Sequence, residues 1–534
     1  MIVEASVEFK VSPAKVWDLL INPEMTKQYM FGCEVESDWE IGSPVLWKGR
    51  SENGEEIVFV KGDVLDIGKN IVAVVLACNG YEVIDLGVMV SCEEIVKKAK
   101  EHDASIIGMS GLITPSLDEM IHNVKEFKRL GFDVPVMIGG ATTSKAHTAI
   151  KVAEHYDGAI AQVGDASLVV EICSKLLNPD TRDQYTKELK EKQKAIKERF
   201  ESGDSAKTKL VDLSTARDWK NITDWETVEI AKPSFIGKKV FNDISLEDIL
   251  PYIDWSPFFW TWQLKGTYPK ILNNEKYGEH ATSLFNDAND LLKTIIKEKK
   301  FNAKAVVSIW KANSVGDDVE IYDEKNSHID TFRFLRQQKE KTEHNPHMCL
   351  SDFIAPKDSE RSDYLGGFAV TMSRDVEDYA DSFKDQGDDY SSILIKALGD
   401  RFAEALAEYM HKEIRDAFEY GKNESLSNED LIKEKYRGIR PAAGYPACPD
   451  HTEKGTLWNV LDVEKEIGLT LTENFAMNPA SSVSGLYFTH PKSKYFTLGP
   501  IGKDQVKDYA KRKEMSVEKA EKWLAPNLGY NPEG

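Results

Sequence analysis

The residues best suited to chemistry in this 534-residue sequence lie in the stretch RGIRPAAGYPACPDHTEK, from Arg437 to Lys454. Its prolines and its Gly-Tyr pair predict an extended loop whose backbone is open to a ligand. Arg440 enters this loop, and an arginine there can pair with a carboxylate through its guanidinium fork. The residues alone leave open a plainer alternative, a structural loop with a surface arginine.

A second polar loop lies within VKGDVLDIGKNIV, from Val60 to Val72. It follows an apolar strand and leads into a helix, and a helix N-terminus in such a place can hold a ligand. Taken alone, the segment fits an ordinary strand-to-helix turn equally well.

Alternating strand and helix patterns between residues 57 and 177 predict an α/β domain with a doubly wound parallel sheet. Ligands of such sheets bind at the carboxyl ends of the strands, where the polar, Gly-rich loops of this sequence fall. The expected strands are Ile57–Val60, Val83–Leu86, Ser105–Met109, Val134–Ile138 and Ala159–Val163. The expected helices are Asn70–Cys78, Cys92–His102, Ser116–Leu130, Ser144–His155 and Ala166–Leu177.

The flanking segments differ in character. Residues 1–61 predict a short α+β fragment, with a helix through Leu20 and a hairpin turn at Asn53-Gly54. Residues 179–212 are dominated by charge and predict a solvated helical linker. Residues 213–534 predict a larger α+β domain. Within it, Glu377–Gly421 is expected to be mostly helical, with apolar residues at helical spacing: Leu398, Phe402, Leu406, Tyr409 and Ile414.

The composition limits the partners. The net charge of -21 makes nucleic acid and membrane surfaces poor partners. The six cysteines form no C-x-x-C pair, so we expect reduced thiols and no zinc site. The N-terminus does not read as a signal peptide, and no run approaches the roughly 20 apolar residues that span a bilayer. A cytoplasmic protein is therefore expected.

The sheet segment resembles the cobalamin-binding domain of cobalamin-dependent methionine synthase. That family carries D-x-H-x-x-G after the first strand, then S-G-L, then G-G, and this chain has Asp63–Gly68, Ser110–Leu112 and Gly139-Gly140 in the same order. The resemblance implies a flavodoxin-like domain over residues 62–178 that takes the nucleotide tail of cobalamin into its sheet. The contact positions that it implies are Gly62, Asp63, Val64, Leu65, Asp66, Gly68, Ser110, Thr114, Gly139, Gly140 and Ala166.

One position departs from the family pattern. The family's histidine that binds cobalt is replaced by Leu65. Leucine has no lone pair and cannot ligate a metal, so no metal ligand is expected in this chain. Asp63, which partners that histidine in the family, loses this role.

Residues 1–61 are also not the family's helical cap. The pattern VEFKVSPAKVWDLLINPEMTKQY resembles the first half of a START-like helix-grip domain, as in heat-shock ATPase activators. We hypothesise that two genes join within KGDVLDI, as a natural fusion, a recombinant or an assembly artefact. Half a helix-grip sheet leaves an open edge, so poor order is expected there unless the fragment docks.

The C-terminal domain resembles the family's activation domain, which binds S-adenosylmethionine through R-P-x-x-G-Y-P-x-C-P. Here that motif begins at Arg440 and continues to Pro449, while YIDWSPFFWTW and HPKSKYF match further segments of the domain. The resemblance assigns the ligand's carboxylate to Arg440 and its amino group to Asp254. The implied site is Asp254, Glu404, Glu434, Arg440, Ala442, Gly444, Tyr445, Tyr495 and Phe496. Plainer roles remain open, namely a helix cap for Asp254 and solvated helix faces for Glu404 and Glu434.

The resemblance covers roughly Gly62 to Tyr530 and implies cobalamin, as methylcobalamin, and S-adenosylmethionine as cofactors. The implied function is reductive re-methylation of cobalamin, with electrons from a flavodoxin-like protein or another reductase. No catalytic protein residue is assigned. The family's homocysteine and folate modules are not recognisable, and a separate chain could supply them, although the sequence shows none. The alternative, suggested by Leu65, is a non-catalytic fragment or fusion product that only binds S-adenosylmethionine and cobalamin.

Overall fold

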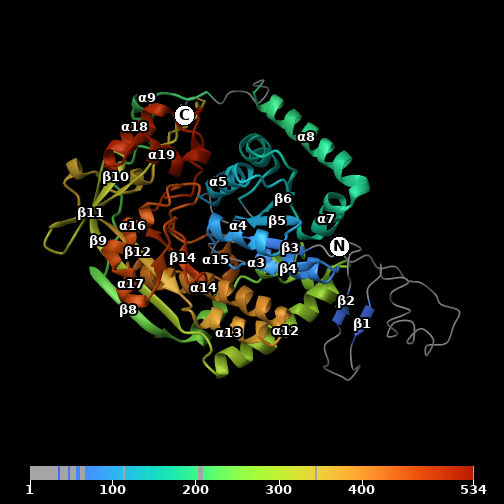
Figure 1. The fold of residues 1–534 in the computed structure, drawn as a ribbon. Coiled ribbons are helices and arrows are strands. Elements are labelled where there is room, and N and C mark those ends of the chain that lie inside the picture. Colours follow the sequence, from blue (N-terminus) through green and yellow to red (C-terminus); the bar gives the residue numbers. More distant parts are fainter. Residues whose placement is uncertain are drawn as a thin grey trace. The chain divides into compact units, whose positions relative to one another are not determined.

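The computed structural model describes residues 34–36, 46–48, 56–60, 67–88, 90–111, 115–140, 142–201, 209–342 and 345–532. The chain forms two compact units, Met1–Ser205 and Ala206–Gly534. Figure 1 traces both units in sequence colours. None of the helices in these described ranges has the length and apolar character that crossing a membrane requires.

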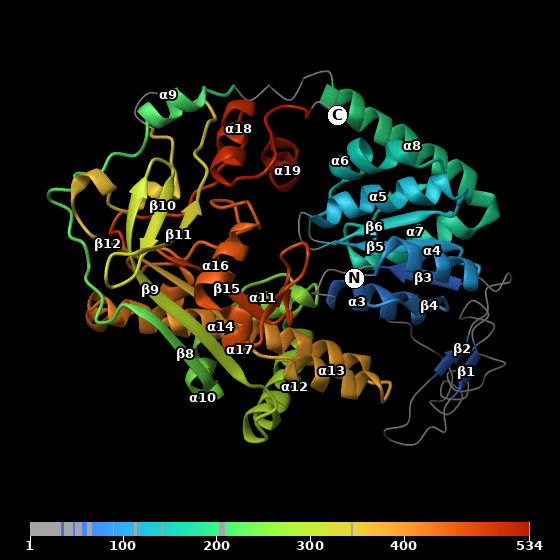
Figure 2. The ribbon, with the colours of Figure 1, turned by 60° about the vertical axis from the view of Figure 1, so that its left-hand side comes forward.

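The first unit is built on a parallel sheet of five strands in the order β4-β3-β5-β6-β7. Within this sheet, β4, the second strand in sequence, lies at the edge and β3, the first, lies beside it, which is the flavodoxin-like order. Figure 2 shows β4, β3, β5 and β6 side by side. The strands are β3 (Glu56–Val60), β4 (Glu82–Asp85), β5 (Ile106–Ser110), β6 (Val136–Gly139) and β7 (Ile160–Gln162). The expected doubly wound sheet is therefore confirmed.

Helices cover both faces of this sheet, because successive strand residues point to opposite sides. Ile107 packs with α4 and α5, whereas its neighbour Ile106 packs with α3 and α7. The strands are accordingly apolar on both faces, as parallel strands usually are. The helices are α3 (Ile67–Ala77), α4 (Cys92–Glu101), α5 (Pro115–Arg129), α6 (Lys145–His147) and α7 (Val169–Leu177). A π-helix at Thr148–Val152 and a 3-10 turn at Ala153–His155 continue α6.

The charged segment after α7 forms the helix α8 (Pro179–Glu201). Helix α8 packs onto the first unit, where Tyr185 and Leu189 contact the core and Gln193 Nε2 donates to the Ile160 carbonyl at 2.7 Å. This part of the expected linker is thus fixed to the sheet domain by a few residues of an otherwise solvated helix.

Little of residues 1–61 is described. The strands β1 (Glu34–Glu36) and β2 (Leu46–Lys48) pair antiparallel. The expected helix through Leu20 and the turn at Asn53-Gly54 lie outside the described residues. The strand β3 belongs to the sheet of the first unit although it precedes Gly62.

The second unit is built on an antiparallel sheet, and helices pack against it. The strand order is β11-β10-β9-β12-β15, and β8 also pairs with the long strand β9. The strands are β8 (Gly237–Ile244), β9 (Ala303–Val315), β10 (Asp318–Tyr322), β11 (His328–Arg333), β12 (Asp363–Thr371) and β15 (Ser482–Tyr487), with the short pair β13 (Thr470–Leu471) and β14 (Met477–Asn478).

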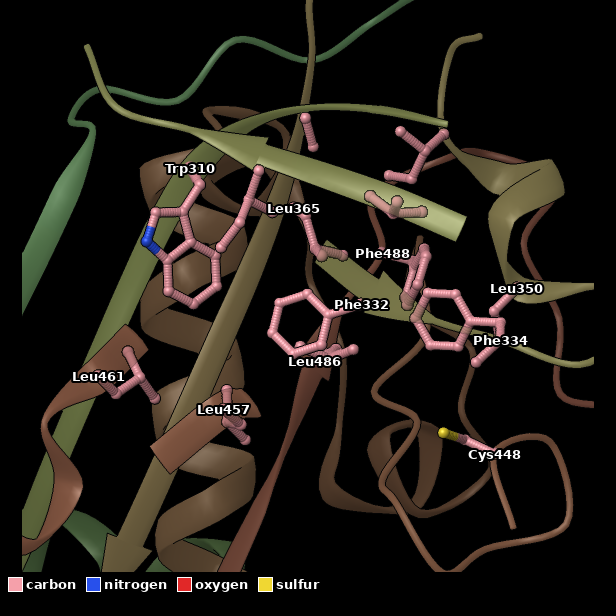
Figure 3. Packing of buried hydrophobic residues seen from close by; sticks show 14 of the residues in the cluster. Trp310, Phe332, Phe334, Leu350, Leu365, Cys448, Leu457, Leu461, Leu486 and Phe488 are labelled. Carbon is pink, nitrogen blue, oxygen red and sulfur yellow. The ribbon is translucent and has the colours of Figure 1, made fainter. Parts of the chain in front are cut away.

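The core of this unit lies between the sheet and the helix α16. Trp310, Phe332, Leu457 and Phe488 pack together there with 4% exposure or less (Figure 3). The helices are α9 (Leu213–Asp218), α10 (Leu246–Ile249), α11 (Ser256–Thr261), α12 (Gly278–Lys297), α13 (Asp375–Lys384), α14 (Asp389–Ala417), α15 (Asn428–Ile432), α16 (Glu453–Leu461), α17 (Val463–Ile467), α18 (Lys503–Arg512) and α19 (Val517–Trp523).

The long helix α14 lies beside α13 (Figure 2) and buries one face against the sheet. Phe402 and Leu406 are fully buried, as the helical spacing of the sequence predicted. Tyr409 is only half-buried and contacts Tyr252 at 5.7 Å between ring centroids. The opposite side of α14 is thereby left to carry polar residues.

Candidate functional site

The loop that begins at Arg440 is held along the strand β15. The Leu486 amide donates to the Pro441 carbonyl at 2.9 Å, and Ile439 and Phe488 exchange both backbone bonds. The Gly444 amide donates to the Cys448 carbonyl at 2.7 Å and closes the loop on itself. The predicted extended loop therefore has a fixed backbone rather than a free one.

Arg440 points from this loop toward helix α14. Its Nη1 donates to Glu408 Oε2 at 2.8 Å, and its backbone N–H donates to the Tyr495 hydroxyl at 2.9 Å. Burial opposes the charge, but Glu408 holds the pKa of Arg440 above its usual value. A half-buried, permanently charged guanidinium is suited to binding an anionic group.

Two more of the predicted residues lie within electrostatic range of this guanidinium. Burial raises the pKa of Glu434, Arg440 lowers it and Glu408 raises it. Desolvation and then the charge of Glu404 raise the pKa of Tyr445, and Arg440 lowers it, although the residue as a whole is 62% exposed. Tyr495 thus contacts Arg440 directly, Glu434 and Tyr445 lie within electrostatic range of it, and Glu404 lies within that range of Tyr445.

Glu434 also has an unusual backbone. Its φ of 53° lies in the left-handed region, which a residue with a Cβ adopts at a cost. The turn is closed by its N–H, which donates to the Leu431 carbonyl at 2.9 Å. Strained positions of this kind often occur at functional sites.

The remaining predicted residues of this loop have different surroundings. Ala442 is half-buried beside Pro441, and Gly444 has a φ of 94° that favours glycine. Phe496 packs against the hydrophobic core of Figure 3 rather than standing free.

Asp254 takes part in a helix start. Its Oδ1 accepts a hydrogen bond from the Ser256 N–H at 2.9 Å, at the beginning of α11. Within the described residues, no hydrogen bond or ion pair joins Asp254 to Arg440. Asp254 thus forms a turn one residue before the cap residue Trp255, which has no side-chain cap bond, and a role toward a ligand stays a prediction.

Sequence reasoning missed Glu408, although it contacts Arg440 directly. It also missed His411 and Tyr487, whose rings stack at 5.1 Å beside the same guanidinium. Burial, Arg440 and Arg415 hold the pKa of His411 well below its usual value, so its imidazole is neutral. The signal in the sequence is the spacing 404, 408, 411, 415, which places these polar residues on one face of a helix.

The second candidate site lies at the carboxyl edge of the parallel sheet. Ser110 and Gly139 are paired in register at the ends of β5 and β6. A Cβ at Gly140, whose φ is 101°, would lie 2.1 Å from the Gly111 carbonyl oxygen. The backbones that follow β5 and β6 therefore pack directly against each other, which leaves no room for a side chain at Gly140.

Gly68 and Ala166 lie at the same edge of the sheet, because they follow the ends of the parallel strands β3 and β7. Gly68 is in the first turn of α3, and a Cβ added to it would meet nothing within 4 Å. Ala166 begins a 3-10 turn that Asp165 caps. The other predicted positions lie outside the described residues, namely Gly62, Asp63, Val64, Leu65, Asp66 and Thr114.

Among the described residues, no group of three or more His, Cys, Asp or Glu side chains could hold a metal ion.

Two family models match the chain. The model for the vitamin B12 dependent methionine synthase activation domain matches residues 245–514. The model for the B12 binding domain matches residues 57–170. The two matches correspond to the Arg440 unit and to the parallel sheet.

Solved structures add a further similarity. The MetH reactivation domain bound to AdoHcy is 52% identical, covering 61% of this chain and 100% of that chain, with a TM-score of 0.59. A novel cobalamin-binding protein from Desulfitobacterium hafniense DCB-2 is 35% identical over 23% of this chain and 60% of its own, with a TM-score of 0.21. The second score is too low to carry an argument.

Proposed function

Because the chain belongs to the family of vitamin B12-dependent methionine synthases and carries both its B12-binding and its activation domain, we propose that it re-methylates reduced cobalamin with S-adenosylmethionine. When bound, cobalamin supplies the cobalt nucleophile and S-adenosylmethionine supplies the methyl group, so the protein needs no base of its own. The contribution of the protein is to bind and orient both molecules. The two family matches do not favour the alternative of a fragment that only binds.

The observation that carries this proposal is the surroundings of Arg440. Its guanidinium offers a partner for the ligand's carboxylate. The carboxylates of Glu404 and Glu434 lie in the same neighbourhood and suit the positive sulfonium. The exposed ring of Tyr445 and the ring of Tyr495 offer flat surfaces to the adenosyl group. We propose Asp254, Ala442, Gly444 and Phe496 as the other members of this site.

For cobalamin, the bare strand ends at Ser110, Gly139 and Gly140 support a site for the nucleotide tail. We include Gly68, Ala166 and the positions outside the described residues in this proposal. Leu65 cannot ligate cobalt, so the cofactor would be held without a protein axial ligand.

Calorimetry with S-adenosylmethionine tests the first site. Arg440→Ala should weaken binding by about tenfold or more, because a charge-assisted pair to the ligand's carboxylate is lost. Arg374→Ala removes an exposed arginine on the same unit and should bind as the wild type does. Equal binding by Arg440→Ala and the wild type would remove Arg440 from the site.

The visible spectrum of added cobalamin tests the second site. We expect a histidine-bound spectrum only in Leu65→His. The same spectrum in the wild type would mean that another residue ligates cobalt, and the assignment of Leu65 would be wrong.

We propose domains at residues 62–178 and 213–534, with 179–212 between them and a partial helix-grip fragment at 1–61. We further propose a flavodoxin-like protein or another reductase as the electron donor, methylcobalamin as the product form, and a cytoplasmic location. A reductase that restores turnover when mixed with the chain would support the choice of donor.

A further inference from the structure

Arg440 is the last member of a chain of four charged residues. Its Nη1 lies 2.8 Å from Glu408 Oε2, and the other carboxylate oxygen of Glu408 lies 3.6 Å from Arg415 Nη1. Arg415 Nε in turn donates to Glu424 Oε2 at 2.8 Å. The side chains of the middle pair are largely enclosed, at 14% exposure for Glu408 and 2% for Arg415.

This charge chain, Glu424–Arg415–Glu408–Arg440, also returns to the ligand loop. The backbone N–H of Arg437 donates to Glu424 Oε1 at 3.4 Å. Both Arg437 and Arg440 are therefore tied to helix α14 through Arg415 and Glu408.

Aromatic rings enclose the charge chain. The Arg415 guanidinium carbon lies 4.7 Å from the centre of the Tyr436 ring, and His411 packs edge-on to that ring at 4.7 Å between centroids. Ion pairs that are kept from water are strengthened, and their loss is costly. Among the described residues, Glu408 is the carboxylate that contacts both Arg440 and Arg415.

Glu408 binds one of the three nitrogen atoms of the Arg440 guanidinium, Nη1. Glu408 accepts from Nη1 of Arg440, while no hydrogen bond to a described residue uses Nε or Nη2. Nε and Nη2 form one edge of the guanidinium, and this edge can bind a carboxylate with two parallel bonds. Glu408 therefore occupies Nη1, while Nε and Nη2 have no hydrogen-bond partner among the described residues.

We propose that Glu408 is a positioning residue, which holds Nη1 of Arg440 so that Nε and Nη2 face the carboxylate of S-adenosylmethionine. Arg415 and Glu424 keep Glu408 in place. The inference rests on the proposed function, since it assumes that this ligand binds at Arg440. Under this inference, Glu408 strengthens the binding of ligands that carry the carboxylate and does not affect recognition of the adenosyl group.

Calorimetry on the full chain with two ligands tests the inference. The ligands are S-adenosylmethionine and decarboxylated S-adenosylmethionine, which lacks the group that Arg440 would bind. Glu408→Gln keeps the length of the side chain but removes its charge. It should raise the Kd for S-adenosylmethionine by about tenfold and leave the Kd for the decarboxylated ligand within about twofold. Glu413→Gln, an exposed residue on the same helix, should change neither.

If Glu408 only stabilised the fold, Glu408→Gln would raise the Kd of both ligands equally, and that result would overturn the inference. Unchanged or tighter binding of S-adenosylmethionine would overturn it as well. In the Arg440→Ala background, Glu408→Gln should have no further effect on S-adenosylmethionine, because the two residues act as one unit. A further loss of about tenfold in affinity for S-adenosylmethionine in the Arg440→Ala background would contradict the inference.

Should Glu408→Gln fail to fold by circular dichroism, Arg415→Lys tests the same chain of contacts. It keeps the charge but loses the bond from Nε to Glu424. It should weaken the binding of S-adenosylmethionine and leave the binding of the decarboxylated ligand unchanged. An equal effect on both ligands, or none, would overturn the inference. If the wild type fails to bind S-adenosylmethionine, or Arg440→Ala binds it equally well, the proposed function itself fails.

Discussion

The ring of His451 lies directly against Gly444. A Cβ added at Gly444 would come within 2.3 Å of His451 Cε1, and the φ of Gly444 is 94°. The loop that carries Arg440 therefore rests on a buried histidine and has no room for a side chain at this point.

Gly444→Ala should destabilise the second unit by about 3 kcal/mol, since it adds a clash to the backbone cost of a positive φ. Gly468→Ala is the matched control, because Gly468 also has a positive φ, of 72°, but nothing lies within 4 Å of an added Cβ. The control should cost about 1 kcal/mol. Urea denaturation measures both, and equal losses would show that His451 does not restrict the loop.

The same histidine should make stability depend on pH. Burial, and then Lys454, lower the pKa of His451 to about 4. The unfolded chain takes up the proton near pH 6.5, so stability is fully present above that pH and falls as the pH drops toward 4, by about 3 kcal/mol at most.

His451→Gln should reduce this slope in denaturation curves measured from pH 7 to pH 4. Some slope should remain, because burial also lowers the pKa values of His411 and His490. His328→Gln, on the surface, should keep the wild-type slope. An unchanged slope in His451→Gln would contradict the assignment.

Gly140 should be intolerant of any side chain. Gly140→Ala would place Cβ 2.1 Å from the backbone oxygen of Gly111, and backbone cannot move aside cheaply. We expect loss of cobalamin binding by titration of the visible spectrum. Gly131→Ala shares a positive φ, of 75°, without any neighbour within 4 Å, and should retain binding. Retained binding by Gly140→Ala would place the nucleotide tail elsewhere.

Glu434 has a strained backbone and is a proposed member of the ligand site, and one substitution tests both properties. Glu434→Gly should stabilise the unit by about 1 kcal/mol, because glycine adopts a positive φ without strain. It should also weaken the binding of S-adenosylmethionine. Glu514→Gly relieves a similar φ of 54° outside the site and should stabilise without weakening the ligand. If both variants bind alike, Glu434 does not belong to the site.

Patterns local in sequence predicted much of this fold. The alternation of strands and helices gave the parallel sheet, and the spacing of Phe402 and Leu406 gave helix α14. The packing of α8 was not predictable in the same way, because only Tyr185 and Leu189 interrupt a charged surface.

The partners of the site residues were harder to foresee. Glu408 is one of several glutamates on α14, and its partner Arg440 lies 32 residues away. Pairing at that separation depends on the tertiary fold. The motif predicts Arg440, whereas the contact of its side chain with Glu408 depends on how the loop packs against helix α14.

The most direct test of the central proposal is a single-turnover methyl transfer. The chain is loaded with cobalamin, reduced chemically and given S-adenosylmethionine with an isotopically labelled methyl group, and the cobalamin is then analysed by mass spectrometry. We predict label on cobalamin with the wild type and its loss in Arg440→Ala. No label with the wild type, although both ligands bind, would contradict the proposed function.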